Sequence, residues 1–187
     1  QLRLPDRSGV VRVRNRLTTL LLGQGRKADA EAVYRELVEA RAGHLAPDDV
    51  RLIAARVDLG ANMCLHGDRG AGEALLEDAI AVAAEARANA KEGMERPLRR
   101  AARVLVDGWI KSGQVVKAAE LAGRAVVWAE GLPPTNRELR LALRHQVRAM
   151  LAAGDTAGAT AVVEATAKKF GDAGEGLVEL LRGELAK

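Results

Sequence analysis

Apolar residues recur along this chain at steps of three and four positions, the spacing that places side chains on one face of an α-helix. Two segments show this pattern clearly: Ala30, Val33, Leu37 and Ala40, and then Leu98, Ala101, Leu105 and Trp109. No run alternates between apolar and polar residues over the length of a strand. The sequence therefore predicts an all-α protein.

Helix-starting and helix-stopping residues divide the chain into nine predicted helices. Ser8 can cap a helix that begins near Val10, Pro47 and Pro97 suit a first turn, and a Pro-Pro-Thr-Asn segment interrupts the pattern at 133–136. The predicted helices span residues 10–23, 27–43, 48–66, 70–90, 95–112, 115–130, 136–153, 156–170 and 174–186. The last helix has one apolar side, as expected of a helix that caps a repeat array. This side consists of Leu177, Leu180, Leu181 and Leu185.

A glycine ends the first helix of each predicted pair, and the residues around it recur. The turn glycines are Gly25, Gly67, Gly113 and Gly154, at intervals of 42, 46 and 41 residues. Five residues after the glycine comes a small residue: Ala30, Gly72, Ala118 or Ala159. Eight residues before it comes a leucine in three repeats, Leu17, Leu59 and Leu105, and Gln146 in the fourth.

This recurrence predicts helical hairpins. Glycine can adopt the left-handed conformation that ends a helix, and a small residue at the start of the second helix lets the two backbones approach. We expect the earlier leucine to fill the space between the helices. The predicted repeat units lie near 10–43, 48–90, 95–130 and 136–170, followed by the cap at 174–186.

Two of these units resemble the tetratricopeptide repeat family. The similar positions are Leu59, Gly60, Gly67, Gly72 and Ala79, and then Leu105, Gly113, Ala118 and Ala125. The unit is longer than the usual ~34 residues. In this it resembles the long-helix, kinesin-light-chain-like variety that is frequent in bacterial proteins, where a connector similar to residues 44–49 precedes the next helix.

The resemblance implies a right-handed superhelical solenoid of about four helix-turn-helix repeats plus a C-terminal capping helix, in a single domain over residues 1–187. HEAT or armadillo units have a similar period of ~40 to 47 residues and are the alternative fold. The small residue five positions after each glycine favours the tetratricopeptide interpretation.

Composition narrows the classes of function. Aromatic residues make up only 2% of the chain, too few for a base-stacking platform. The net charge is +4, with nearly balanced acids and bases, so a nucleic-acid role is permitted but not indicated. No apolar stretch is long enough for a membrane span or a signal peptide, so we expect a cytoplasmic protein with no membrane contact. The chain begins with Gln1 instead of Met, which suggests part of a longer protein.

No constellation points to catalysis, a cofactor or a metal site. The three histidines, His44, His66 and His145, lie in different units without the spacing of a metal site, and we expect them to be solvated. Cys64 is the only cysteine and is expected to be a small buried hydrophobe. We therefore expect a protein that is not an enzyme.

Arginines gather on the predicted first helices of the hairpins. In the resembled family these helices line a concave groove. Alignment on the turn glycines places a set of polar residues on the groove side, and the apolar second unit adds Val57, which can accept an apolar side chain of a partner. The predicted partner-binding groove consists of Arg12, Asn15, Thr19, Val57, Arg100, Arg103, Asp107, Lys111, Arg144 and Arg148. Because Arg103 and Asp107 are an i, i+4 pair that can neutralise one another, a solvated charged face is the alternative.

These features predict a module that binds a protein or an acidic peptide, since the planar guanidinium makes bidentate contacts with carboxylates. The first alternative is a ligand-sensing regulatory repeat domain of a bacterial nucleotide-switch ATPase or transcription regulator. The second is RNA binding along the basic groove.

Overall fold

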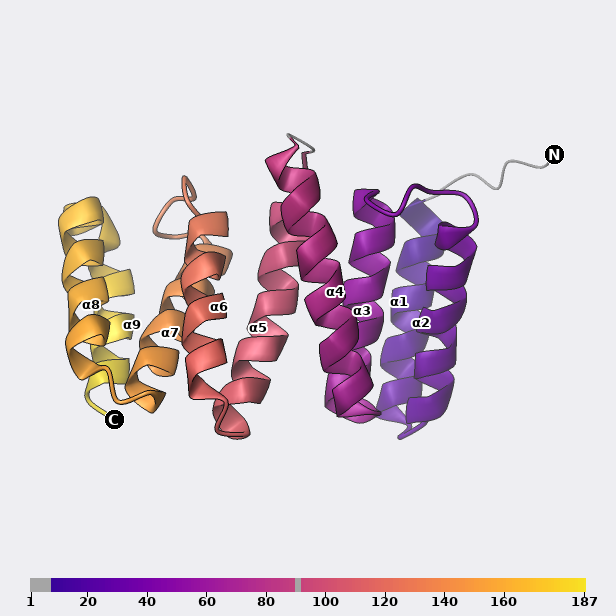
Figure 1. The fold of residues 1–187 in the computed structure, drawn as a ribbon, viewed down its shortest axis with the longest axis horizontal. Helices are drawn as coiled ribbons and strands as arrows, with labels where there is room; N and C mark the ends of the chain where they lie inside the picture. Colours follow the sequence, from indigo (N-terminus) through magenta and orange to yellow (C-terminus); the bar gives the residue numbers. More distant parts are fainter. Residues whose placement is uncertain (1–7, 90–91) are drawn as a thin grey trace. The chain divides into compact units, whose positions relative to one another are not determined.

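The computed structural model describes residues 8–89 and 92–187, and within these ranges the regular structure is helical (Figure 1). The α-helices are α1 (Ser8–Gly23), α2 (Lys27–Ala42), α3 (Val50–His66), α4 (Arg69–Ala88), α5 (Glu95–Lys111), α6 (Val115–Trp128), α7 (Arg137–Ala152), α8 (Thr156–Phe170) and α9 (Glu175–Leu185). A short 3-10 turn, η1 (Gly171–Gly174), joins the last two. The all-α prediction is confirmed, and each predicted helix is found close to its expected bounds.

The chain divides into two compact units, Gln1–Leu75 and Leu76–Lys187, and the division falls within α4. In the first unit α2 packs against both α1 and α3. In the second unit α6 packs against α5 and α7, and α8 packs against α7. Helix α7 also contacts α5 and α9 directly, so it has neighbours on several sides. That residues 1–187 form a single domain stays a prediction.

Three of the four hairpin turns use glycine as predicted. Gly25, Gly113 and Gly154 have φ of +74°, +77° and +81°, in the left-handed region. In the third hairpin the Gln114 N–H donates to the Trp109 carbonyl oxygen at 2.8 Å, and the Gly113 N–H donates to that of Ile110 at 3.3 Å. These are the two hydrogen bonds of a Schellman motif, which satisfy carbonyl groups at the end of the helix.

The second hairpin turns differently, and the prediction of a left-handed glycine is wrong there. Gly67 has φ of −128°, and only Gly67 and Asp68 separate α3 from α4. This two-residue link is too short for the Schellman geometry of the other turns. Instead the Asp68 carboxylate caps α4 by accepting the Ala71 N–H at 3.1 Å.

The small residue after each turn lies where two helices come closest. Ala30, Ala118 and Ala159 are fully buried. At Gly72 the approach is closer still, because a Cβ there would lie 2.7 Å from the backbone nitrogen of Cys64 and 2.8 Å from the carbonyl oxygen of Gly60. The first turn of α4 therefore leaves no room for any side chain at this position.

Two details of the predicted repeat need correction. Leu59 and Leu105 are buried as expected, but Leu17 is 42% exposed and does not fill the first hairpin. Pro47 precedes α3 instead of lying in its first turn, because Asp49 forms the N-cap and accepts the Arg51 N–H at 2.8 Å. Pro97 does lie in the first turn of α5. The side chain of Ser8, predicted to cap the first helix, lies outside the described residues.

The terminal helix covers the end of the second unit, as predicted. Leu177, Val178 and Leu181 of α9 are buried, and Leu180 and Leu185 are half-buried. Contacts with both α7 and α8 show that α9 closes the apolar face of the last hairpin. Uncovered, this face would expose apolar surface to water.

We expect Ala118→Leu and Ala159→Leu to lower the free energy of unfolding by about 1 to 3 kcal/mol each, because no space exists for a larger side chain between the helices. Ala157→Leu, at an exposed position of α8, should change it little. Urea unfolding followed by circular dichroism measures all three. Equal effects would show that the repeat register is wrong.

Two glycines of α4 provide a sharper comparison. Gly72→Ala should destabilise the protein although alanine favours helices, because the new Cβ would collide with the backbone of α3. Gly70→Ala should leave stability unchanged or raise it, since the nearest atom to a Cβ there is an Asp68 oxygen at 3.5 Å. Thermal unfolding of both variants tests this, and a Gly72→Ala variant as stable as the parent chain would contradict the close approach.

Candidate binding surface on α5 and α7

Among the predicted groove residues of the first compact unit, the structure describes the side chains of Thr19 and Val57. The side chains of Arg12 and Asn15 lie outside the described residues. Thr19 is exposed on α1. Val57 is only 1% exposed, so it belongs to the core and has no surface for a partner. The prediction that Val57 accepts an apolar side chain of a partner is therefore wrong, because the side chain is buried inside the protein.

The other predicted groove residues lie in the second compact unit, Leu76–Lys187. They lie on the neighbouring helices α5 and α7, where spacings of three and four place them along one face of each helix. Arg140 of α7 was not among the predicted groove residues, but it lies one helical turn before Arg144. We call the combined set the α5–α7 surface: Arg100, Arg103, Asp107 and Lys111 from α5, with Arg140, Arg144 and Arg148 from α7. Arg100 and Lys111 are exposed, and the others are half-buried.

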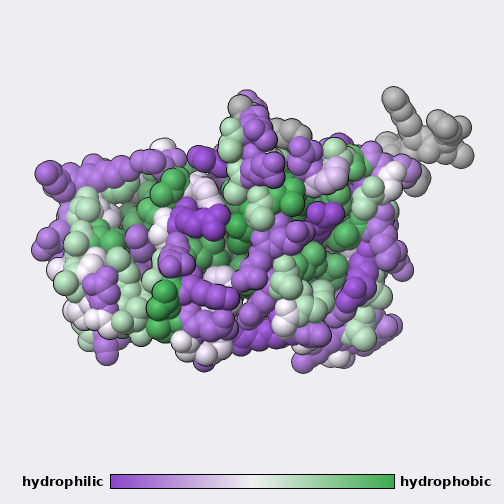
Figure 2. All heavy atoms as spheres, in the orientation of Figure 1, coloured by the Kyte–Doolittle hydropathy of each residue, from purple (hydrophilic) through white to green (hydrophobic). Residues whose placement is uncertain are grey.

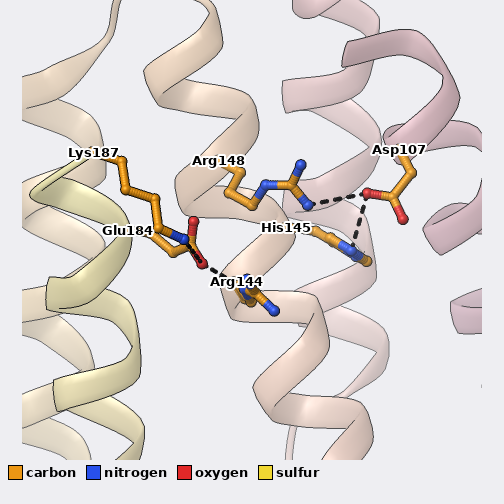
Figure 3. Close-up of polar contacts among 6 residues, drawn as sticks. All are labelled: Asp107, Arg144, His145, Arg148, Glu184 and Lys187. Carbon is orange, nitrogen blue, oxygen red and sulfur yellow. Dashed lines mark hydrogen bonds and ion pairs between the residues drawn. The ribbon is translucent and has the colours of Figure 1, made fainter. Parts of the chain in front are cut away.

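Asp107 connects the two helices (Figure 3). Its Oδ1 accepts a hydrogen bond from Nη1 of Arg148 at 3.2 Å, and Nε2 of His145 lies 3.4 Å from the same oxygen. The sequence suggested that Asp107 neutralises Arg103 on its own helix. In the structure its ion-pair partner is instead Arg148 of the next hairpin, so one predicted binding arginine is balanced internally.

Arg144 is balanced in the same way by the terminal helix. Its Nε donates to Oε1 of Glu184 on α9 at 2.6 Å, and the Lys187 ammonium lies 3.1 Å from that oxygen (Figure 3). Glu184 is only 5% exposed. Burial alone would raise the pKa of its carboxyl, but the hydrogen bonds from Arg144 and Lys187 outweigh burial and lower that pKa.

His145 is buried, with 6% exposure, so the prediction of a solvated histidine is wrong for this residue. Helices pack around α7 and leave little of its surface open. Burial lowers the pKa of His145; Asp107 acts in the opposite direction, while Arg148, Arg103 and Arg144 lower it further. The imidazole is therefore neutral near pH 7, and the positive charge of this surface comes from arginine and lysine.

Charge is concentrated on these two helices. Helix α5 carries five basic and two acidic residues, and α7 carries four basic and one acidic residue. The side chains of three cations, Arg103, Lys111 and Arg140, make no hydrogen bond or ion pair with any residue in the described ranges. These three cations are available to an anionic ligand.

The contacts of three residues in this region were not predicted from the sequence. Arg99 is directed to the end of α6, where its Nη1 donates to the Trp128 carbonyl oxygen at 2.9 Å. His145 gave no signal, because its burial depends on the packing around α7. Glu184 could have been recognised from the sequence. It follows Leu177 by seven positions and Leu181 by three, so it lies on the apolar side of the helix.

Cys64, the one cysteine of the sequence, carries a thiol that its surroundings do not activate. Burial is the largest cause that raises the pKa of the Cys64 thiol to about 11, so this thiol is a poor nucleophile. Among the described residues, no three His, Cys, Asp or Glu side chains are grouped to hold a metal ion. Of the helices in the described ranges, none combines the length and apolar character needed to cross a bilayer.

Comparisons with known proteins bear on the fold. No protein-family model matches the chain, and no curated protein sequence matches it. Two crystal structures of the nearly identical TPR-like repeats of a protein assigned as a kinesin light chain from Podosopora anserina are similar in structure. One of them, a form with a single substitution, superposes with a TM-score of 0.69 at 19% identity and covers 94% of both chains. The other superposes with a TM-score of 0.69 at 18% identity and covers 97% of both.

The fold class is therefore that of a TPR-like helical repeat protein, as predicted. The comparison supports tetratricopeptide-type hairpins over the HEAT or armadillo alternative. At this level of identity it concerns the fold alone, and a binding role has to be argued from the residues of this chain.

His145 predicts a pH dependence of stability. Because the folded state lowers the pKa of His145 below its ordinary value of 6.5, the unfolded chain takes up the proton first as the pH falls. Stability from this residue is fully present above pH 6.5 and is lost as the pH falls toward the folded pKa. We expect the free energy of unfolding, measured in urea, to fall as the pH drops below about 6.5, and to fall less in His145→Gln. The same decline in both proteins would mean that another group is responsible.

Proposed function

We propose that this chain binds an acidic segment of another protein on the α5–α7 surface. The observation that carries the proposal is the set of three cations, Arg103, Lys111 and Arg140, that have no partner among the described residues and lie on two adjacent helices. They lie beside the internally paired Arg144 and Arg148, which add to the positive charge of the same surface.

Arginine on a helical surface suits carboxylate recognition. The guanidinium offers a planar fork of donors, and helical packing fixes the backbone positions from which Arg103 and Arg140 extend. Aspartate or glutamate side chains spaced along an extended peptide can reach cations from both helices. Arg144 and Arg148 also contribute positive potential, but some of their N–H donors are already used by Glu184 and Asp107.

The structure also decides which substitutions test the site. Since Arg148 pairs with Asp107, a glutamate at 148 would place two carboxylates side by side and lower stability. Arg103 and Arg140 have no such partner among the described residues, so they are the better positions to reverse.

We expect Arg103→Glu with Arg140→Glu to weaken binding of acidic peptides about tenfold. The melting temperature should change little, because neither arginine side chain has a partner among the described residues and a glutamate at 103 costs only about 0.2 to 0.5 kcal/mol against Asp107 one turn away. The probe is an array of acidic peptides with matched copies that carry glutamine for each glutamate, incubated with the full 187-residue chain. Fluorescence anisotropy then measures the dissociation constants of the retained peptides.

The matched control reverses two other cations, Lys168→Glu on α8 and Arg182→Glu on α9, both exposed. It changes the net charge equally and should leave peptide binding intact. Equal binding of the glutamine copies, or equal loss in the control, would refute a localised acidic-peptide site. Binding of single-stranded RNA with a steep salt dependence, without binding of acidic peptides, would support the RNA alternative instead.

We further infer that the chain works as a scaffolding or sensing part of a larger bacterial, cytoplasmic protein. The support is the similarity in fold to the TPR-like repeats of a protein assigned as a kinesin light chain. The alternative, a regulatory repeat domain of a nucleotide-switch ATPase or transcription regulator, would use the same surface to hold an acidic segment of its own effector domain.

A further inference from the structure

A pocket lies on another face of α7. It is a pocket of about 240 Å³ between the end of α6, the first half of α7 and the end of α8. Its walls are mostly apolar, and apolar surface is visible between α6 and α8 in Figure 2. Principal lining residues are Val127, Leu132, Leu139, Leu143, Gln146 and Phe170.

This pocket is separate from the α5–α7 surface. Leu139, Leu143 and Gln146 follow one another at steps of four and three on α7, so they share one face. At about 100° per residue, Arg144 and Arg148 project from other faces of the helix, away from the centre of the pocket wall. Occupation of one site therefore leaves the other accessible.

Gln146 marks the pocket as a departure from the repeat. In the second and third repeats the equivalent residues, Leu59 and Leu105, are buried and fill the space between helices. Gln146 is instead half-buried, lines the pocket, and has no hydrogen-bond partner among the described residues. An unpartnered amide that offers both donors and an acceptor inside apolar walls is suited to a peptide group.

The rim carries one charge of each sign. Glu130 lies in the loop after α6, and Lys169 lies near the end of α8 with its ammonium 5.6 Å from the centre of the Phe170 ring. Both are exposed. A partner that is acidic on one side of its apolar anchor and basic on the other would complement this rim in one orientation only.

We propose that this pocket binds one bulky apolar side chain of an extended peptide segment, with the adjoining peptide group on Gln146, an acidic residue beside Lys169 and a basic residue beside Glu130. The volume favours a side chain over a drug-sized molecule, whose pockets usually start at roughly 300 Å³. The proposal does not depend on the acidic-peptide function of the α5–α7 surface.

The first test uses N-acetyl-tryptophanamide, which carries an apolar side chain and two peptide groups, titrated into the ¹⁵N-labelled full chain. We expect saturable shifts of backbone signals at Val126, Gln146 and Thr166. Ala165→Leu should abolish them by filling the pocket, while Ala161→Leu, one turn earlier on α8 and outside the pocket, should not. Gln146→Leu should weaken the amide by about fivefold or more.

3-Methylindole serves as the comparison, because it has the same ring without peptide groups. If it binds the parent chain as well as the amide does, or if Ala161→Leu and Ala165→Leu behave alike, the peptide-recognition proposal is wrong. Absence of any saturable shift with the amide also overturns it. Arg103→Glu should not change the affinity of the amide, which separates this test from that of the α5–α7 surface.

The second test concerns the rim. The blocked tripeptides Glu-Trp-Lys and Lys-Trp-Glu have identical composition, and we expect their dissociation constants to differ by about threefold. The double exchange Glu130→Lys with Lys169→Glu should reverse the preference. Equal affinities in the parent chain, or an unchanged preference after the exchange, would exclude the proposed charge recognition.

Discussion

Backbone approach at the start of the second helix is the constraint on which each hairpin depends. Ala30, Ala118 and Ala159 are fully buried there, and Gly72 lies so close to α3 that even a Cβ would collide with its backbone. Helices that meet so closely have little room for large side chains between them. The low aromatic content follows from this geometry, because a core of Ala, Leu and Val fills the narrow space without forcing the helices apart.

The same packing determines the electrostatics of the second unit. Once α5 and α9 both lie against α7, charged residues on its inner face can no longer all be solvated. Asp107 and Glu184, one from each neighbour, supply carboxylates where Arg148 and Arg144 need them. Of these four side chains only that of Glu184 is buried, and a buried charge is tolerated only when it is paired and hydrogen-bonded. The ion pairs are thus a consequence of close helix packing, and they reduce the positive charge available to ligands.

Local features of the fold were predictable from sequence, and contacts between hairpins were not. Helical periodicity and the turn glycines act within a few residues, so they indicated the helices and three of the four turns. The prediction for Gly67 was wrong because the link between α3 and α4 has only two residues, and the presence of a glycine does not indicate the length of the link. The Arg148–Asp107 and Arg144–Glu184 pairs join residues that are 41 and 40 positions apart in the sequence. For Asp107 the sequence also offered a local partner, Arg103 at i, i+4 spacing, so the distant partner could not be predicted.

Internal pairing also determines how a ligand can use this surface. A ligand carboxylate that binds Arg148 has to compete with Asp107 for the guanidinium. If the ligand displaced Asp107, this carboxylate would lose its ion-pair partner and keep only the neutral imidazole of His145 as a neighbour. The side chain of Asp107 is 39% exposed, so losing its pair with Arg148 costs up to about 1 kcal/mol. Arg103, Arg140 and Lys111 carry no such penalty, because no described acid holds them. Selectivity on the α5–α7 surface therefore rests on these three cations, while the paired arginines contribute positive potential and keep the two helices in register.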